Sequence, residues 1–405
     1  MSNVPPLPSD VWALIIGDYV SHVEDRLRLA LTSASLRELT LPSIFQRLSF
    51  TRFSIREPGV PVAATFSERD VVLVSSAHIT ERIKFLHSRS DVRGYVHEVV
   101  IYGWSARPLS PRAAERVEIR RATNYAYGAI DSILSTLPQL KKLRIVGSPI
   151  TLSMRSLLPQ LPHLESLDIR DIIGEVQDII IGDKQDYRTT ASRGFRCLKE
   201  LTFLCRERFD GGTLYLRQLL ATLAPDHLTR LSIYDWCLPH IMTTNMDLRF
   251  LLHVSIELRL DGRATDMAPL YRLLARSQDI REIRVMPTIS PSSPPPSGDL
   301  LPRLESVSGS IDILTTLVPG RPVRRIELFT TFPIPFRFSP LQNSAVDITS
   351  LSLNVRALLA EDITHCGHVL RKLRHFTIQL RSQLPRQHQN CIVSMGHLQS
   401  VGLLM

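Results

Sequence analysis

The stretch from residue 348 to residue 403 decides the fold, because it contains one pattern three times: ITSLSL (348–353), LRHFTI (373–378) and LQSVGL (398–403). Apolar residues occupy the first, fourth and sixth positions of each copy, and successive copies begin 25 residues apart. Residues two apart share one face of a β-strand, so the fourth and sixth positions are predicted to face a core. The stretch therefore predicts short strands that return at a fixed interval.

The same pattern recurs toward the N-terminus, mostly at intervals of 24 to 34 residues, and the intervals of 30 and 34 residues indicate loop insertions. A degraded copy is Leu304–Val307 with Gly309, and a weaker copy ends in Ile256 and Leu258. The clear copies are Leu140-Leu143-Ile145, Leu164-Leu167-Ile169, Leu198-Leu201-Phe203, Leu228-Leu231-Ile233, Ile280-Ile283-Val285 and Val323-Ile326-Leu328.

The segments between copies must return the chain, and several carry the apolar spacing of a helix, as at Ile130-Ile133-Leu134-Leu137 and Leu270-Leu273-Leu274. A single strand–helix unit cannot bury both of its faces, whereas stacked units can. An α/β solenoid is therefore predicted, with a globular α/β domain of parallel strands as the alternative.

Residues 95–405 resemble the leucine-rich-repeat family, whose repeats are about this long. The asparagine or cysteine that closes the family's strand signature is absent from most copies, where Gly147, Asp171 and Asp235 stand instead. The resemblance implies a parallel sheet on the concave side and helices on the convex side.

The first fifty residues have a different apolar pattern, which predicts three short helices. The first helix begins after Leu7-Pro8-Ser9-Asp10, with Ser9 as a candidate cap. The second contains Leu27, Leu29, Ala30 and Leu31. The third follows Thr32-Ser33 and reaches Leu41 before Pro42, and Leu48-Ser49-Phe50 is predicted to be the first strand.

This module resembles the F-box, in its fungal form, through the segments at 7–16, 29–37 and 41–50. The family's usual tryptophan after the third-helix arginine is missing, with Glu38-Leu39 in its place. F-box proteins dock on the adaptor subunit of cullin-based ubiquitin ligases. The resemblance implies adaptor contacts by Leu7, Pro8, Ile15, Ile16, Leu31 and Leu36. The alternative is a plain helical cap on the solenoid.

Three regions follow: an F-box-like helical module at 1–47, connecting strands, helices and first irregular repeats at 48–130, and the repeat solenoid at 131–405. A Pro/Ser-rich insertion at 288–299 interrupts the solenoid. The N-terminus lacks the features of a signal peptide and no apolar run has the length of a membrane span. A cytoplasmic or nuclear location is therefore expected, with no membrane association.

The net charge of +9 would allow acidic or nucleic-acid partners, but the arginines are spread along the whole chain, so nucleic-acid binding is not expected. Five scattered cysteines predict no disulfide. The His365-Cys366-Gly367-His368 segment lacks a second ligand pair at zinc-site spacing. No catalytic or phosphate-binding motif is present, so the chain is expected to have no cofactor, no metal and no enzymatic activity.

The strand pattern predicts which side chains line the concave surface, where repeat proteins bind their partners. The predicted partner-binding residues are Arg144, Asp168, Arg170, Tyr234, Glu257, Arg259, Arg284, Glu327, Phe329 and Asn354, beside Thr202, Ser232, Ser352, Thr377 and Gln379. These residues favour a protein partner, since arginine and aromatic side chains dominate interface energetics. The predicted function is a substrate-recruiting adaptor of a cullin-based ubiquitin ligase, with a repeat scaffold outside any ligase as the alternative.

Overall fold

The chain forms two compact units in the computed structural model, residues 1–198 with 208–211 (unit 1) and residues 199–207 with 212–405 (unit 2). The structure describes residues 11–12, 15–16, 22–51, 68–104, 113–148, 150–171, 195–205, 227–243, 248–257, 268–286, 300–329, 339–355, 372–380 and 400–404. The predicted insertion at 288–299 lies outside these residues, apart from its flanks, and so do Arg259, His365 and His368.

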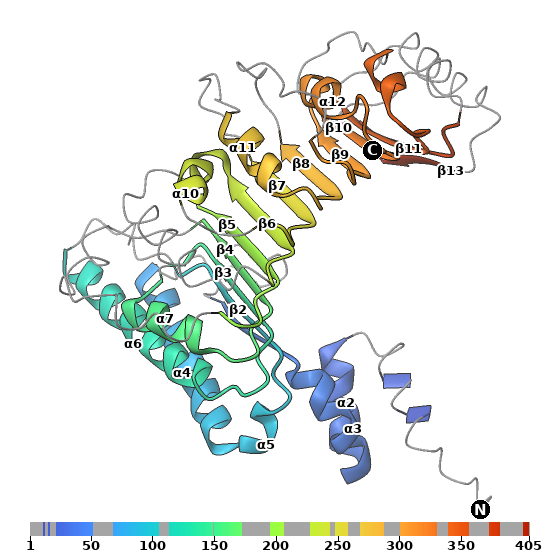
Figure 1. The fold of residues 1–405 in the computed structure, drawn as a ribbon. Helices are drawn as coiled ribbons and strands as arrows, with labels where there is room; N and C mark the ends of the chain where they lie inside the picture. Colours follow the sequence, from blue (N-terminus) through green and yellow to red (C-terminus); the bar gives the residue numbers. More distant parts are fainter. Residues whose placement is uncertain are drawn as a thin grey trace, which may run out of the picture. The chain divides into compact units, whose positions relative to one another are not determined.

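Unit 1 alternates helices with single strands (Figure 1). Its elements are α2 (Val23–Thr32), α3 (Ala34–Phe45), β1 (Arg47–Thr51), α4 (Glu68–Ser88), α5 (Ser90–Arg93), β2 (Glu98–Tyr102), α6 (Ala113–Leu134), β3 (Lys142–Val146), α7 (Leu152–Leu157), η1 (Leu158–Gln160) and β4 (Ser166–Arg170).

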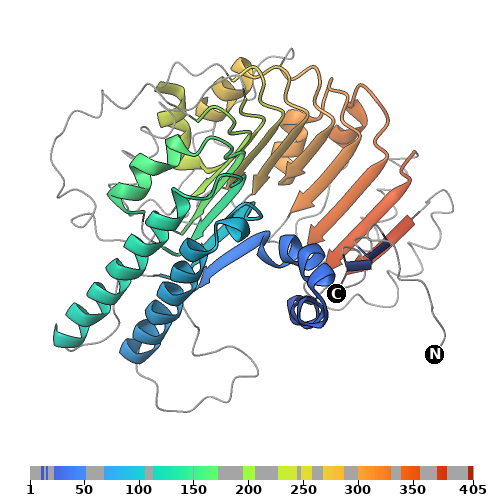
Figure 2. The ribbon, with the colours of Figure 1, turned by 90° about the horizontal axis from the view of Figure 1, so that it is seen from below.

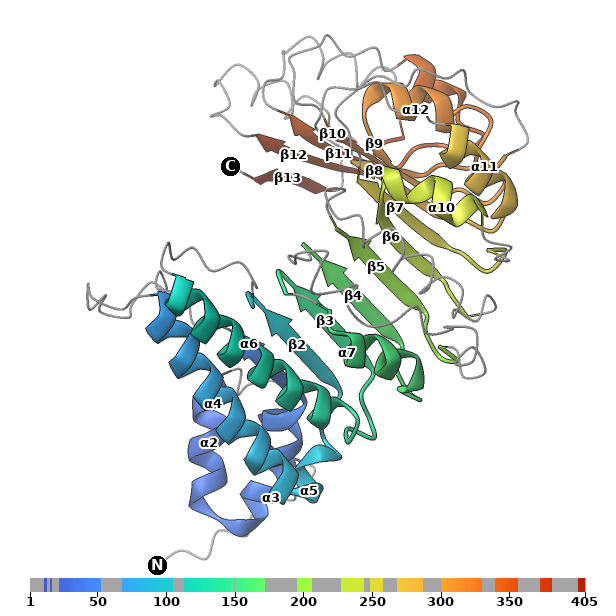
Figure 3. The same ribbon diagram turned by 90° about the vertical axis from the view of Figure 1, so that its left-hand side faces the viewer.

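The four strands of unit 1 form a parallel sheet in sequence order, β1-β2-β3-β4. The register aligns one apolar residue of each strand in a single row across the sheet. These residues are Leu48, Val99, Leu143 and Leu167. All four of these side chains are at most 2% exposed. The helices α4, α6 and α7 cover this apolar face of the sheet (Figure 3), and the opposite, open face carries the alternate residues.

The N-terminal module packs α2 against α3, as the sequence predicted for the second and third helices. The Ser33 hydroxyl accepts a hydrogen bond from Leu36 N at 3.1 Å and so caps α3. Arg37 Nε donates to the carbonyl of Ala30 at 3.3 Å, which ties the two helices together. The third helix runs past Pro42 to Phe45 instead of ending before the proline. Hydrogen bonds from the Thr40 hydroxyl to the carbonyls of Leu36 and Arg37 support the helix at this point.

Unit 2 repeats the strand-and-return plan with shorter helices. Its elements are β5 (Glu200–Leu204), β6 (Arg230–Tyr234), η2 (Asp235–Cys237), α10 (Leu238–Thr243), β7 (His253–Glu257), α11 (Ala268–Arg276), β8 (Glu282–Met286), β9 (Ser306–Gly309), α12 (Ile311–Leu317), β10 (Arg325–Phe329), η3 (Ser339–Asn343), β11 (Ser350–Val355), β12 (His375–Leu380) and β13 (Ser400–Leu404).

The strands β5 to β13 also pair in parallel and in sequence order, side by side in Figures 1 and 2. The helices α10, α11 and α12 lie on one face of this sheet. Parallel strands stacked through short return segments are the architecture of a leucine-rich-repeat solenoid, an α/β fold. Each unit therefore has the repeat architecture that the sequence predicted.

The apolar residues of the predicted repeat copies that the structure describes are buried in the strands or just before them. The weak copy is corrected by two residues: the buried strand positions are Val254 and Ile256 in β7, and Leu258 lies outside the described residues. A further copy, Val96-Val99-Ile101, was missed and forms β2, with all three side chains fully buried.

One main-chain arrangement recurs between neighbouring strands in both units. The carbonyl just before a strand accepts hydrogen bonds from two consecutive N–H groups at the start of the following strand. Gln46 O, at the end of α3, accepts from His97 N and Glu98 N at 2.9 and 3.0 Å. The other acceptors are the carbonyls of His97, Lys141, Lys199, Thr229, Leu252, Arg281, Glu305, Arg324 and Thr349. We call this series of carbonyl acceptors the carbonyl ladder. The helical module supplies its first member, Gln46 O.

Two tryptophans connect neighbouring repeats through hydrogen bonds, at places where the sequence lacks the family's asparagine. Trp104, two residues past β2, donates its indole N–H to the carbonyl of Phe50 in β1 at 3.0 Å. Trp236, two residues past β6, donates to the carbonyl of Cys205, just past β5, at 3.0 Å. Both indoles are buried, and each therefore satisfies a carbonyl of the preceding repeat.

Gly309 explains the degraded copy at residues 304–309. A Cβ at this position would lie 2.9 Å from Cγ2 of Ile313, on α12, so only glycine lets the helix pack this closely on β9. The second inward position of this repeat is therefore filled by the helix rather than by a strand side chain.

Candidate functional site

The open face of unit 1 carries a charged cluster at the sequence-predicted positions. Arg144 on β3 pairs in register with Asp168 on β4, and Arg170 lies two residues beyond Asp168 on the same strand face. The carboxylate of Asp168 accepts a hydrogen bond from Arg170, whose Nε lies 2.7 Å from Oδ1, and forms an ion pair with Arg144, whose Nε lies 3.2 Å from Oδ2. The Asp168 side chain is 18% exposed, while those of Arg144 and Arg170 are 44% and 40% exposed. The structure thus brings three of the predicted residues together.

The open face of unit 2 has a middle row dominated by small hydroxyl side chains. The strand register places Glu257 in the neighbouring row, opposite Tyr234 and Met286, while Ser255 occupies the middle row. The middle row consists of Thr202, Ser232, Ser255, Arg284, Ser308, Glu327, Ser352 and Thr377. Only two of these eight side chains are charged.

Arg284 and Phe329 form a second cluster within this face. The guanidinium of Arg284 lies over the ring of Phe329 at 5.2 Å from its centroid, and Nε donates to the sulfur of Met286. Phe329 was expected to be exposed, but it is only 7% exposed because the arginine covers it. Glu327 instead accepts a hydrogen bond from the Ser308 hydroxyl at 3.1 Å. No described carboxylate forms an ion pair with Arg284, in contrast to Arg144.

The other predicted strand-face residues are placed as follows. Asn354 donates to Gln379 Oε1 on the next strand at 3.1 Å. Tyr234 is half-buried at the end of β6. These two residues therefore line the same face without joining either charged cluster.

The helical module presents an apolar stripe on α2. Leu31 is 79% exposed, and Leu27, one turn earlier on the same helix face, is 45% exposed. Of the other predicted adaptor contacts, Ile15 and Leu36 are half-buried, and Ile16 is 2% exposed and therefore part of the core. Leu7 and Pro8 lie outside the described residues.

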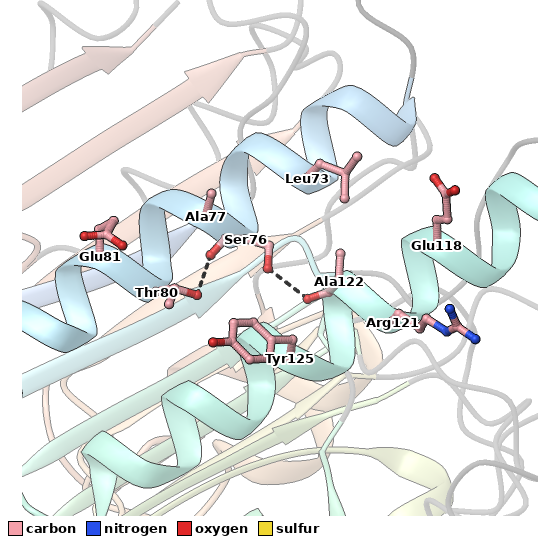
Figure 4. A pocket seen from close by; sticks show the side chains of 9 residues that line it. All are labelled: Leu73, Ser76, Ala77, Thr80, Glu81, Glu118, Arg121, Ala122 and Tyr125. Atoms are coloured by element: carbon pink, nitrogen blue, oxygen red, sulfur yellow. Dashed lines mark hydrogen bonds between the residues drawn. The ribbon is translucent and has the colours of Figure 1, made fainter.

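A groove between α4 and α6 was not predicted (Figure 4). Its volume is about 740 Å³, and its floor consists of small residues at the point where the Ser76 hydroxyl donates to Ala122 O at 3.0 Å. The rim includes Leu73 and Tyr125, which are 38% and 64% exposed. The run of alanine, serine and threonine on α4 and α6 is the only signal in the sequence that could have indicated so close a helix contact.

One half-buried carboxylate connects α6 to α7. The Oδ2 atom of Asp131 accepts hydrogen bonds from the hydroxyls of Thr151, at 2.8 Å, and of Ser153. Burial raises the pKa of the Asp131 carboxyl above its ordinary value, although these two hydroxyls act in the opposite direction. The arrangement is structural, because Thr151 also caps α7 through Met154 N.

The described part of the chain offers few features for metal binding or membrane insertion. No group of three or more His, Cys, Asp or Glu residues there could hold a metal ion. The helices described there include none that is both long and apolar enough to cross a membrane.

No protein-family model matches the sequence, and no curated protein matches it either. Among solved structures, the chain is similar to the crystal structure of a TLR13–ssRNA13 complex, with 15% sequence identity and a TM-score of 0.36. The match covers 78% of this chain and 41% of that chain, so this chain spans less than half of that protein's length. A likeness this distant carries no argument about function, and the repeat architecture rests on the strand register above.

Proposed function

We propose that the chain is a substrate-recruiting adaptor subunit of a cullin-based ubiquitin ligase. In this proposal the F-box-like helical module docks on the ligase's adaptor subunit, and the open strand faces hold a protein substrate. The chain itself contributes proximity and orientation, while other ligase subunits supply the chemistry.

The observation that carries the proposal is the exposed apolar stripe of α2 beside a direct connection to the repeats. Leu27 and Leu31 expose apolar surface that a monomeric helical cap would tend to bury. The last helix of the module, α3, ends at Phe45, and Gln46 already supplies the first of the carbonyls that accept hydrogen bonds from the next strand. A partner bound to α2 would therefore be held in a fixed orientation to the first repeats.

Binding of the purified full chain to the cullin adaptor subunit tests the proposal. We expect the double variant Leu27→Asp, Leu31→Asp to weaken adaptor binding at least ~10-fold, because each buried leucine contributes about 1.5–3 kcal/mol at an apolar contact. Val117→Asp on α6 is the matched control, since Val117 is 51% exposed but lies outside the module. The control should bind like wild type.

A folded wild-type chain that does not bind the adaptor would reject the ligase proposal. The remaining function would be that of a repeat scaffold that binds proteins through its strand faces. Equal losses in the module variant and in Val117→Asp would also count against docking through α2.

A further inference from the structure

The groove between α4 and α6 combines a cavity with a projecting aromatic side chain (Figure 4). Its floor is made of small side chains, with Ser76 and Ala77 on α4 and Ala122 on α6, and its volume is about 740 Å³. Tyr125 lies about one turn after Ala122 on the same helix and is 64% exposed, so its ring stands in solvent at the edge of the groove. One patch of the surface therefore offers both a cavity and a bulky side chain of the kind that such a cavity accepts.

Two contacts hold α4 and α6 parallel and close together along the groove. The Ser76 hydroxyl donates to Ala122 O at 3.0 Å, and His87 Nε2 lies 3.2 Å from the Ser132 hydroxyl oxygen about three turns further along. Every described residue that lines the groove belongs to one of these two helices, so the groove has two walls and a floor but no cover. A small molecule is usually buried over most of its surface, which two walls do not provide, so the face suits another protein surface.

The charges at the two ends of the groove are balanced. Glu81 pairs with Lys84 at 2.8 Å at one end, and Glu118 and Arg121 lie at the other end. These four side chains sum to zero at neutral pH, although the whole chain carries a net charge of +9. A strongly acidic or basic partner would gain little from such a rim. A second copy turned end to end would bring an acid and a base to each end, so acids can lie opposite bases without any excess of like charge.

We infer that the chain pairs with a second copy of itself through this groove, with Tyr125 of each copy lying in the groove of the other. A two-fold contact uses the same patch twice, so it requires a patch that is complementary to itself. The neighbouring cavity and ring meet this requirement in shape, and the balanced rim meets it in charge. The inference concerns α4 and α6 alone and does not depend on the proposed ligase role. Pairing would double every strand-face site, so a partner with two epitopes would bind with avidity.

The area of the two-helix face sets the expected strength of the pair. The helices α4 and α6 have 21 and 22 residues. Side by side they present a face of about 31 Å by about 20 Å, or roughly 600 Å² per copy, against about 800 Å² per partner in a standard interface. We therefore expect a reversible dimer with a dissociation constant on the order of micromolar.

Sedimentation velocity of the purified full chain, without any other protein, tests the inference over about 1 to 100 μM, which brackets the expected dissociation constant. Wild type should shift from monomer to dimer, and added salt should leave the dimer intact because apolar contact holds it. Tyr125→Ala should weaken pairing at least ~100-fold, since loss of a well-packed interface tyrosine commonly costs tenfold or more and the substitution occurs twice in a two-fold pair. Phe250→Ala is the matched control, because Phe250 is an exposed aromatic residue of unit 2, and it should pair like wild type.

A mixture of two variants tests the reciprocal seating of the ring. Ala77→Trp fills the groove with a bulky side chain at an exposed position and should abolish pairing on its own. Mixed with Tyr125→Ala, it should form a mixed dimer. The intact ring of one variant then enters the intact groove of the other, and the added tryptophan faces the missing ring. Fluorescent labelling of one variant reports the mixed species in the same sedimentation experiment, and circular dichroism confirms that both variants are folded.

Three outcomes would overturn the inference. A folded wild type that stays monomeric over the whole concentration range would leave the groove to a different protein. A dimer that survives both Tyr125→Ala and Ala77→Trp would place the contact elsewhere. Loss of the dimer in Leu27→Asp, Leu31→Asp, with Tyr125→Ala still paired, would assign the contact to the apolar stripe of α2 instead.

Discussion

Unit 1 and unit 2 have the same kind of sheet but different return segments. In unit 1, α4 and α6 are 21 and 22 residues long, whereas α10, α11 and α12 of unit 2 have 6, 9 and 7 residues. Of nine large apolar side chains that are exposed among the described residues, eight belong to unit 1 and only Phe250 belongs to unit 2. The strands determine the repeat architecture in both units. The return segments differ in length, and the longer ones expose additional apolar side chains.

The difference has a physical cause. A repeat needs its two inward strand residues, the carbonyl before the strand and enough apolar cover on one face. Short helices such as α11 supply that cover with little surplus. Long helices such as α4 and α6 extend beyond the sheet that they cover. Side chains on their far ends and outer faces therefore contact solvent or a partner, as Val74, Val117 and Tyr125 do.

The largest expected effect comes from replacing the tryptophan that connects neighbouring repeats in either unit. Trp104→Ala and Trp236→Ala should each lower the free energy of unfolding by about 3–5 kcal/mol, the usual cost of truncating a buried aromatic residue. Hydrogen exchange should show lost amide protection in the unit that carries the substitution. Equal loss in both units after either change would contradict two separately stabilised units. Trp104→Phe keeps an aromatic ring but removes the indole hydrogen bond to Phe50 O together with part of the buried ring, and should cost less than Trp104→Ala, about 0.5–3 kcal/mol.

A pair of glycine substitutions should act in opposite directions in the two units. Gly309→Ala in unit 2 should destabilise by about 1–3 kcal/mol, because the new Cβ would meet Ile313. Gly128→Ala in unit 1 should stabilise by about 0.5–1 kcal/mol, because Gly128 lies within α6 and its added Cβ meets nothing within 4 Å. Urea unfolding of both variants measures the two shifts. A loss of stability in Gly128→Ala would show that the outer face of α6 is not open.

The smallest expected effect is a pH dependence confined to unit 1. Burial raises the pKa of Asp131, so the folded state binds a proton more readily than the unfolded chain. The stability that this proton provides is present below the ordinary carboxyl pKa and is lost as the pH rises through the raised value. Asp131→Asn should therefore be more stable than wild type at neutral pH by under about 1 kcal/mol, since the site is partly solvated. The advantage should vanish in acid, as thermal unfolding at several pH values would show.

The strand positions were predictable because their signal is local. Two apolar residues at a spacing of two, preceded by a third, identify a strand such as β11 or β12 without knowledge of its neighbours. The copy at Val96 was missed because its neighbours in sequence, β1 and β3, lie at irregular intervals. The row of Glu257 was misplaced because Leu258 offered an equally apolar alternative.

The contacts across strands could be predicted only in part. Register places Arg144 beside Asp168, and that pairing follows from the sequence pattern. The burial of Phe329 does not, because it depends on Arg284, which lies 45 residues earlier and two strands away. The groove between α4 and α6 depends on how closely two distant helices approach, which no repeat period encodes.

The carbonyl ladder gives the chain an unusual pattern of mutational tolerance. Its acceptors belong to residues as different as Gln46, Leu252 and Glu305, because only the main chain takes part. Almost any side chain should therefore be tolerated there, with one exception. Proline at either of the two donor positions would remove an N–H and so break one of the two hydrogen bonds. At the described donor positions proline should therefore be far more damaging than alanine, which keeps the N–H.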